Sequence, residues 1–197
     1  MPLSWLADTR IRMYANKTIK KYLQDLSAKK PVPGGGSASA LVAALGASLI
    51  SMVVNFTLGK PKYLKYQKDL NNILAQSEKL HSEFLCLIDQ DILAFLSGDI
   101  KKATQAPYKI ACLCCEGIKL CPQLIAKGNV NLVSDIAVAA VLLESAFGAA
   151  YYNVLINLAK LDRRAASKFK NDLDKKMKLV KKFRVDVEKK VGKIIRR

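Results

Sequence analysis

Residues 31–58 read PVPGGGSASALVAALGASLISMVVNFTL, a glycine-rich loop that leads into a run of small apolar residues without any charged side chain. A helix that is apolar on every side belongs in the middle of a helical bundle or at an interface between subunits. The small side chains of the run let neighbouring helices approach closely. A second run, residues 131–161, has a similar character. The two runs predict long buried central helices.

Either run is long enough to cross a bilayer, which takes about 20 residues. Several features oppose a membrane interpretation. Serine, threonine and asparagine are spread along the first run, and Asp135 and Glu144 interrupt the second. Polar and acidic side chains are costly in the hydrocarbon core of a bilayer. We therefore expect core helices of a soluble bundle and no membrane partner.

The rest of the chain shows helical periodicity and no useful stretch of period-two alternation. We expect helices over residues 2–28, 38–58, 63–97, from 100 or 107 to 120, and from 134 toward 161, followed by a tail helix. Pro122 should either kink the fourth helix or begin a further segment. The core contacts predicted for the first helix are Leu3, Leu6, Ile11, Tyr14, Ile19, Leu23 and Leu26. The chain, residues 1–197, is thus predicted to be a single all-α domain, a helical bundle that dimerises.

Basic residues dominate the charge of the chain, with 33 lysines and arginines against 16 acidic residues and a formal net charge of +17. Most of the excess lies in residues 163–197, where an apolar stripe at helical spacing predicts a basic amphipathic helix. The stripe consists of Phe169, Leu173, Met177, Val180, Phe183, Val187, Val191 and Ile194. A solvated outer face is the simplest interpretation of the lysines. A nucleic-acid or membrane-surface role, and capture of an anionic substrate tail, stay open.

Cysteine usage points to a reducing compartment. The cysteines are odd in number and stand in apolar, helical surroundings, so we expect reduced thiols in the core. They are Cys86, Cys112, Cys114, Cys115 and Cys121. One Cys-x-x-Cys pair and a single histidine, His81, do not make a zinc site, and no metal site is predicted. Residues 1–30 mix charged with apolar residues and contain no apolar stretch of a secretion signal, so we expect a cytoplasmic protein.

The loop before the first apolar run is the best candidate for ligand contact. The glycines Gly34, Gly35 and Gly36 can take up positive φ and let a ligand approach several backbone N–H groups. Ser37 is a candidate N-cap, and the N-terminus of the following helix attracts anionic or electron-rich groups. A flexible entry into a buried helix is the alternative interpretation. The spacing fits neither the dinucleotide-binding nor the P-loop pattern.

Two carboxylates stand in apolar segments and are candidates for proton transfer. A buried Asp91 or Asp135 must be hydrogen-bonded or have a raised pKa, because loss of solvent disfavours the charged form. A carboxyl with a raised pKa suits proton transfer near neutral pH. For Asp135 a role as helix N-cap is the competing interpretation. Asn153 and Asn157 lie one helical turn apart and share a face, where they present amides to a ligand or to a neighbouring helix.

Five short motifs follow one another in a characteristic order. They are Pro31-Val-Pro-Gly-Gly-Gly-Ser37 with Ala43-Ala44-Leu45-Gly46; Thr57-x-Gly59-Lys60 with Lys62-Tyr63; Asp91 with Ala94-Phe95; Gly128-Asn129 with Ser134-Asp135; and Asn153-Val154-x-Ile156-Asn157-Leu158. The ordered set, which spans residues 31–158, resembles the cyclodeaminase/cyclohydrolase family acting on folate.

The resemblance implies an all-helical, usually dimeric enzyme of folate one-carbon metabolism without a permanently bound cofactor. Its members cyclise 5-formiminotetrahydrofolate with release of ammonia, or hydrolyse 5,10-methenyltetrahydrofolate to 10-formyltetrahydrofolate. By resemblance, Asp91 and Asp135 are the catalytic acid or base. The substrate, a tetrahydrofolate derivative that can carry a polyglutamate tail, would be held by Gly34, Gly35, Gly36, Ser37, Lys60, Lys62 and Tyr63, with Asn129, Asn153 and Asn157 orienting the pterin.

One segment departs from the family pattern. Relatives carry a longer stretch with a Leu-Pro-Lys motif after the Ala-Phe pair, whereas here residues 96–106 alone separate Phe95 from Pro107. The alternative function is therefore an inactive family member that serves as a basic helical module binding nucleic acid or protein. The sequence leaves open which of the two reactions an active member would catalyse.

Overall fold

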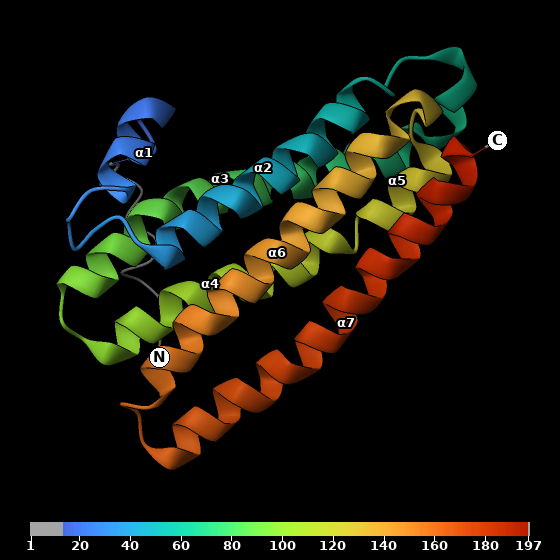
Figure 1. The fold of residues 1–197 in the computed structure, drawn as a ribbon. Helices are drawn as coiled ribbons and strands as arrows, with labels where there is room; N and C mark the ends of the chain where they lie inside the picture. Colours follow the sequence, from blue (N-terminus) through green and yellow to red (C-terminus); the bar gives the residue numbers. More distant parts are fainter. Residues whose placement is uncertain (1–13, 197) are drawn as a thin grey trace.

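The computed structural model describes residues 14–196, and every regular element in this part of the chain is a helix (Figure 1). The α-helices are α1 (Ile19–Leu26), α2 (Gly35–Asn55), α3 (Gln67–Leu96), α4 (Ile100–Ile118), α5 (Cys121–Lys127), α6 (Val133–Leu158) and α7 (Arg163–Ile195). Two short 3-10 helices, η2 (Pro61–Tyr66) and η3 (Val130–Leu132), precede α3 and α6. The all-α prediction is confirmed for the described residues.

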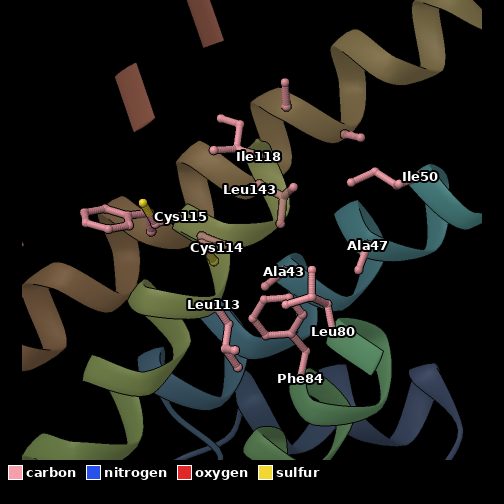
Figure 2. Packing of buried hydrophobic residues seen from close by; sticks show 14 of the residues in the cluster. Ala43, Ala47, Ile50, Leu80, Phe84, Leu113, Cys114, Cys115, Ile118 and Leu143 are labelled. Atoms are coloured by element: carbon pink, nitrogen blue, oxygen red, sulfur yellow. The ribbon is translucent and has the colours of Figure 1, made fainter. Parts of the chain in front are cut away.

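The helices α2, α3, α4 and α6 form the body of the bundle. α2 packs against α3 and α6, α4 packs against α6 and α3, and α7 lies along the outside of α6 and α4 (Figure 1). The core between them combines small residues of α2 with larger residues of the other helices. Figure 2 shows this arrangement for Ala43, Ala47 and Ile50 of α2, Leu80 and Phe84 of α3, Leu113 of α4 and Leu143 of α6. The central apolar runs are therefore helices, as expected.

Glycine and proline residues stand at several helix ends, and Pro122 begins a further helical segment, one of the two predicted outcomes. Gly59 and Gly98 have positive φ values of 74° and 67° and follow the ends of α2 and α3, the conformation in which glycine is favoured. Pro122 stands in the first turn of α5, where a missing N–H costs nothing. Pro107, by contrast, lies inside α4, because that helix already begins at Ile100.

The tail helix has the expected two faces. Asp162 caps its N-terminus by accepting a hydrogen bond from the backbone N–H of Ala165 at 2.9 Å. Every residue of the predicted stripe is buried or packs against the core, and Leu173, Val180, Val187 and Val191 are fully or almost fully buried. The basic residues of α7 lie mostly on its exposed side.

The first helix is shorter than predicted, and two of its expected core contacts are wrong. Ile19 and Leu23 are 73% and 52% exposed, whereas Tyr22 and Asp25 are buried. Contacts with Tyr14 favour this orientation. The Tyr14 ring packs edge-on against Tyr22, and the Tyr14 hydroxyl donates to Asp25 at 3.0 Å. The expected contacts Leu3, Leu6 and Ile11 lie outside the described residues.

One side of the bundle stays apolar and exposed. α2 and the segment 130–158 are long and apolar enough to cross a membrane by length and composition, with mean hydropathy of 2.0 and 1.7. Neither α2 nor α6 contains a lysine or arginine, although the chain is strongly basic. Their large exposed side chains are Leu45, Val138, Val141, Tyr152 and Ile156, with Phe56 just after α2. We call these residues the α2/α6 face.

Candidate active site

A pocket of about 190 Å³ lies where the glycine loop meets the ends of α3, α4 and α6. It is lined by Pro31, Val32, Gly34, Gly35, Gly36, Asp91, Phe95, Ala103, Pro107, Asn153, Ile156 and Asn157. Five helical elements or loops thus contribute to one small cavity. Phe95 and Ala103 lie on either side of the short connection between α3 and α4, so that connection brings α4 into the pocket wall.

Two of the three glycines, Gly35 and Gly36, allow close approach of other side chains, and none of the three has a positive φ. Gly34 is the N-cap of α2 with a φ of −135°, and Gly35 and Gly36 already belong to the helix. A Cβ at Gly36 would lie 2.1 Å from Asp91 Oδ1, and one at Gly35 would lie 3.1 Å from Asn153 Oδ1. The expectation of positive φ in this loop was wrong. Glycine is required at position 36, where Asp91 packs against the start of α2, whereas Gly35 is in tight contact with Asn153 and a Cβ at Gly34 would meet nothing within 4 Å.

Among residues 14–196, Asp91 is the only ionisable residue that lines this pocket. Burial raises the pKa of its carboxyl to about 6, and a hydrogen bond from the backbone N–H of Ser37 opposes the rise. That N–H belongs to the first turn of α2, where unpaired amides and the helix dipole favour a negative charge. A carboxyl with a pKa near 6 exchanges protons readily around neutral pH.

Ser37 does not act as the predicted N-cap and does not line the pocket. Its side chain is completely buried, and its hydroxyl lies 3.1 Å from the hydroxyl of Tyr22 on α1. The N-cap position belongs to Gly34, so that no side chain caps α2. Ser37 instead links α1 to the backbone that holds Asp91.

The two asparagines of α6 reach the pocket together, as predicted. Asn153 Nδ2 donates to the carbonyl of Ala149 at 2.9 Å, and Asn157 Nδ2 donates to the carbonyl of Ala103 at 2.8 Å. One N–H of each amide is thus engaged, and no hydrogen bond to either amide oxygen is present among the described residues, so each oxygen can accept from a ligand. Together with the Asp91 carboxylate, the described part of the chain offers three side-chain acceptor groups and no basic side chain to the pocket. It suits a ligand with N–H donors or positive charge.

The remaining predicted residues lie at the opposite end of α2 and α6. Lys60 and Lys62 are exposed, and Lys62 Nζ lies 5.6 Å from the centre of the Tyr63 ring. The Tyr63 hydroxyl accepts a hydrogen bond from the Val130 N–H at 3.2 Å. The Asn129 side chain stabilises the turn, since its oxygen accepts a hydrogen bond from the Asn131 N–H at 3.1 Å.

Asp135 stands with this second group and not with Asp91. It lies in the first turn of α6, whose N-cap position is Leu132, so Asp135 is not the cap. Asn153 follows it by five helical turns, which places both on one side of α6 but about 27 Å apart. Within one chain, the structure therefore does not bring the two predicted catalytic carboxylates together.

Sequence reasoning missed three contributors to the site. Tyr22 supports Ser37 from behind, Pro107 lines the pocket from inside α4, and Ile156 stands at the pocket with 69% of its surface exposed. A proline inside an otherwise helical pattern was a usable signal for Pro107. Ile156 stands inside the motif of residues 153–158 but was not assigned to the site, and nothing local in the sequence marks Tyr22.

Comparisons with known proteins show what the chain is similar to. The family described as formiminotransferase-cyclodeaminase matches residues 18–98 and 96–178. A methenyltetrahydrofolate cyclohydrolase of Methylorubrum extorquens is 34% identical over 78% of this chain and 85% of its own length. The rat formimidoyltransferase-cyclodeaminase is 29% identical over 72% of this chain, a match that covers 30% of the rat protein. The crystal structure of formiminotetrahydrofolate cyclodeaminase from Thermotoga maritima superposes with a TM-score of 0.86 at 25% identity, over 91% of this chain and 98% of that one.

Proposed function

Since the chain belongs to the formiminotransferase-cyclodeaminase family, we propose that it is a folate one-carbon enzyme that hydrolyses 5,10-methenyltetrahydrofolate to 10-formyltetrahydrofolate. The observation that carries the choice of reaction is its 34% identity to a methenyltetrahydrofolate cyclohydrolase along 85% of that enzyme. The supporting geometry is a pocket with acceptor groups around one carboxyl of pKa about 6. The substrate carries its positive charge on the amidinium carbon between N5 and N10, which such a pocket favours.

In this mechanism Asp91 moves one proton twice. Its carboxylate accepts a proton from water while the water oxygen bonds to the amidinium carbon. The protonated carboxyl then donates to N5 as the bond between N5 and the carbon breaks. The carbon keeps its oxygen as the formyl group on N10, and the hydroxyl proton leaves to solvent. A pKa near 6 serves both steps because neither protonation state of the carboxyl is strongly disfavoured.

Cyclisation of 5-formiminotetrahydrofolate is the second candidate reaction. The close superposition on a cyclodeaminase, with a TM-score of 0.86, favours it. The chemistry is related, since N10 attacks the same carbon and ammonia leaves in place of water entering. Asp91 would then protonate the departing nitrogen. Nothing in either reaction calls for a permanently bound cofactor.

The pocket holds only the reacting end of such a substrate. At about 190 Å³ it is smaller than cavities that enclose whole drug-sized ligands, roughly 300–1,000 Å³. A groove of about 330 Å³ between α2 and α6 shares Gly35 and Asn153 with it and offers room for more of the molecule. The exposed Lys160, Arg163 and Arg164 follow Asn157 along the chain and would attract the glutamate tail.

The proposed enzyme is a homodimer that pairs through the α2/α6 face. Large exposed apolar side chains on two adjacent helices are typical of a subunit interface. The same face carries none of the basic residues that would make two copies of a +17 chain repel each other. A second copy of this chain therefore fits the face better than an anionic partner does. The five free cysteines fit the proposed cytoplasmic location.

Dimerisation would also bring the two groups of predicted residues together. α2 and α6 run in opposite directions, and a two-fold axis that lies across them reverses both helices in the partner. The end of one copy that carries Asp91 then meets the end of the other that carries Lys60, Lys62, Tyr63, Asn129 and Asp135. In this arrangement each site takes Asp91 from one protomer and Asp135 from its partner.

The test is an absorbance assay that follows the methenyl chromophore. Purified protein should accelerate the loss of the signal from 5,10-methenyltetrahydrofolate beyond its spontaneous hydrolysis. Growth of the signal from 5-formiminotetrahydrofolate would instead identify a cyclodeaminase. A protein that changes neither rate would contradict both reactions.

A further inference from the structure

Pro107 leaves one carbonyl of α4 without its usual helical partner. In an α-helix the N–H of each residue donates to the carbonyl four positions earlier. Proline has no N–H, so Pro107 cannot donate to the carbonyl of Ala103. A proline inside a helix is unfavourable, and here it lies beside the candidate active site rather than at a helix end.

The vacant carbonyl is used by a side chain of another helix. Asn157 on α6 donates its Nδ2 to the Ala103 oxygen at 2.8 Å, across 54 positions of sequence. An amide has its donor and its acceptor on opposite branches, so fixing the nitrogen on Ala103 also fixes the direction of Oδ1. Ala103, Pro107 and Asn157 all line the pocket.

Asn153 offers a contrast one turn earlier on the same helix. Its Nδ2 donates to the carbonyl of Ala149, four residues before it in α6. That bond stays within one helix and requires nothing from α4. The orientation of Asn157, unlike that of Asn153, depends on a missing donor in the neighbouring helix.

We propose that Pro107 is a positioning residue for the reaction: it frees the Ala103 carbonyl to hold the Asn157 amide, whose oxygen then accepts a hydrogen bond from an N–H of the substrate heterocycle. The substrate half of this inference rests on the proposed function, and the orienting half rests on geometry alone. An acceptor fixed in this way selects for ligands with a donor at that point and adds no charge to the pocket.

The central experiment is Pro107→Ala, which restores the helical donor to the Ala103 carbonyl. The variant should be at least as thermally stable as the wild type, because alanine is favoured inside a helix. Its KM for 5,10-methenyltetrahydrofolate should nevertheless rise about 5- to 30-fold with kcat within about twofold, the pattern of lost substrate binding away from the reacting carbon. Pro122→Ala is the matched control, since Pro122 opens α5 where no donor is missing, and its KM should not change.

A double-mutant cycle separates positioning from packing. If Pro107 acts through Asn157, then Pro107→Ala should add no further rise in KM to Asn157→Ala. A KM unchanged in Pro107→Ala overturns the proposal. Independent, additive effects of the two substitutions overturn it as well, because they would mean that Pro107 contacts the substrate or shapes the pocket directly.

A readout without substrate keeps this inference distinct from the proposed function. The Asn157 side-chain NH₂ resonances in NMR spectra should exchange slowly with solvent in the wild type and faster in Pro107→Ala. Identical exchange in the two proteins refutes the orienting half. A wild type that turns over no folate refutes the proposed function and the substrate half together, whatever the spectra show.

Discussion

The position of Asp91 suits proton transfer but lowers the stability of the folded protein at neutral pH. Its pKa is raised to about 6 by burial, so the folded protein binds a proton more tightly there than the unfolded chain, whose aspartates titrate near 3.8. The stabilisation that protonated Asp91 provides is therefore complete below about pH 4 and is lost as the pH rises through about 6. At neutral pH the protein keeps a charged carboxylate in a poorly solvated place.

Asp91→Asn should separate these two roles. We expect kcat to fall at least tenfold, as for a lost general base. At pH 7 the free energy of unfolding should rise, because a neutral amide avoids the cost of desolvating a charged carboxylate. We expect a rise of about 1–2 kcal/mol and not more, since the side chain is only partly buried. Urea unfolding measures the second effect. In the wild type, kcat/KM should decline as the pH falls below about 6, and a flat profile down to pH 5 would exclude Asp91 as the base.

Gly36 is a second position at which a small substitution should affect activity, because it has no space for a Cβ atom. A Cβ there would lie 2.1 Å from Asp91 Oδ1, so Gly36→Ala must displace the carboxylate. We expect at least a tenfold loss of kcat/KM, since small misplacements of a catalytic group are costly. Gly192→Ala on α7, where a Cβ meets nothing within 4 Å, is the matched control and should retain full activity. Equal activity of the two variants would show that the close contact has no role.

At the scale of elements, periodicity in the sequence was sufficient to identify the long helices and the inner face of α7. The stripe of α7 follows from spacing alone, and its residues are buried or pack against the core. The orientation of α1 could not be identified in this way, because its buried side makes hydrogen bonds outside the helix, Asp25 with Tyr14 and Tyr22 with Ser37. Spacing describes an apolar stripe well and a short polar helix poorly.

The sequence was a better guide to which residues form the candidate site than to how those residues are arranged. The glycine loop, Asp91, Asn153 and Asn157 were identified and lie together around one pocket. The reason for the glycines was missed, because Asp91 approaches Gly36 across 55 positions of sequence. The distance between Asp91 and Asp135 was missed as well, since an ordered set of motifs does not say which ends of the helices meet.

Pairing through the α2/α6 face predicts that a charge on α6 breaks the dimer and that a charge on α7 does not. Val141 on α6 is 39% exposed and Leu179 on α7 is 37% exposed, so the same substitution can be compared at equal exposure. Val141→Lys should convert the proposed dimer to a monomer in light scattering, because it places a charge in an apolar interface. Leu179→Lys should leave the mass at twice that of one chain. A wild-type monomer, or a dimeric Val141→Lys variant, would contradict pairing through this face.

At the scale of the whole molecule, charge and hydropathy are divided between two sides of the bundle. α7 presents most of the excess lysines and arginines to solvent, while α2 and α6 present none. Two copies that pair through α2 and α6 would keep their basic helices apart on the outside of the dimer. This division lets a strongly basic chain associate with itself while it still attracts an anionic substrate.

A shared site predicts that two inactive variants restore each other. Asp91→Asn and Asp135→Asn should each be at least tenfold less active alone, yet a subunit-exchanged equal mixture should recover about a quarter of the wild-type activity, because half of its dimers are hybrids with one intact site of two. Mixing Asp91→Asn with Gly36→Ala is the control. Both changes damage the same half of the site, so neither hybrid site is intact and no activity should return. No recovery in the first mixture would mean that each protomer works alone. Recovery in the control would mean that Asp91 and Gly36 do not belong to the same half of the site, and full activity of Asp135→Asn alone would mean that Asp135 has no part in the reaction.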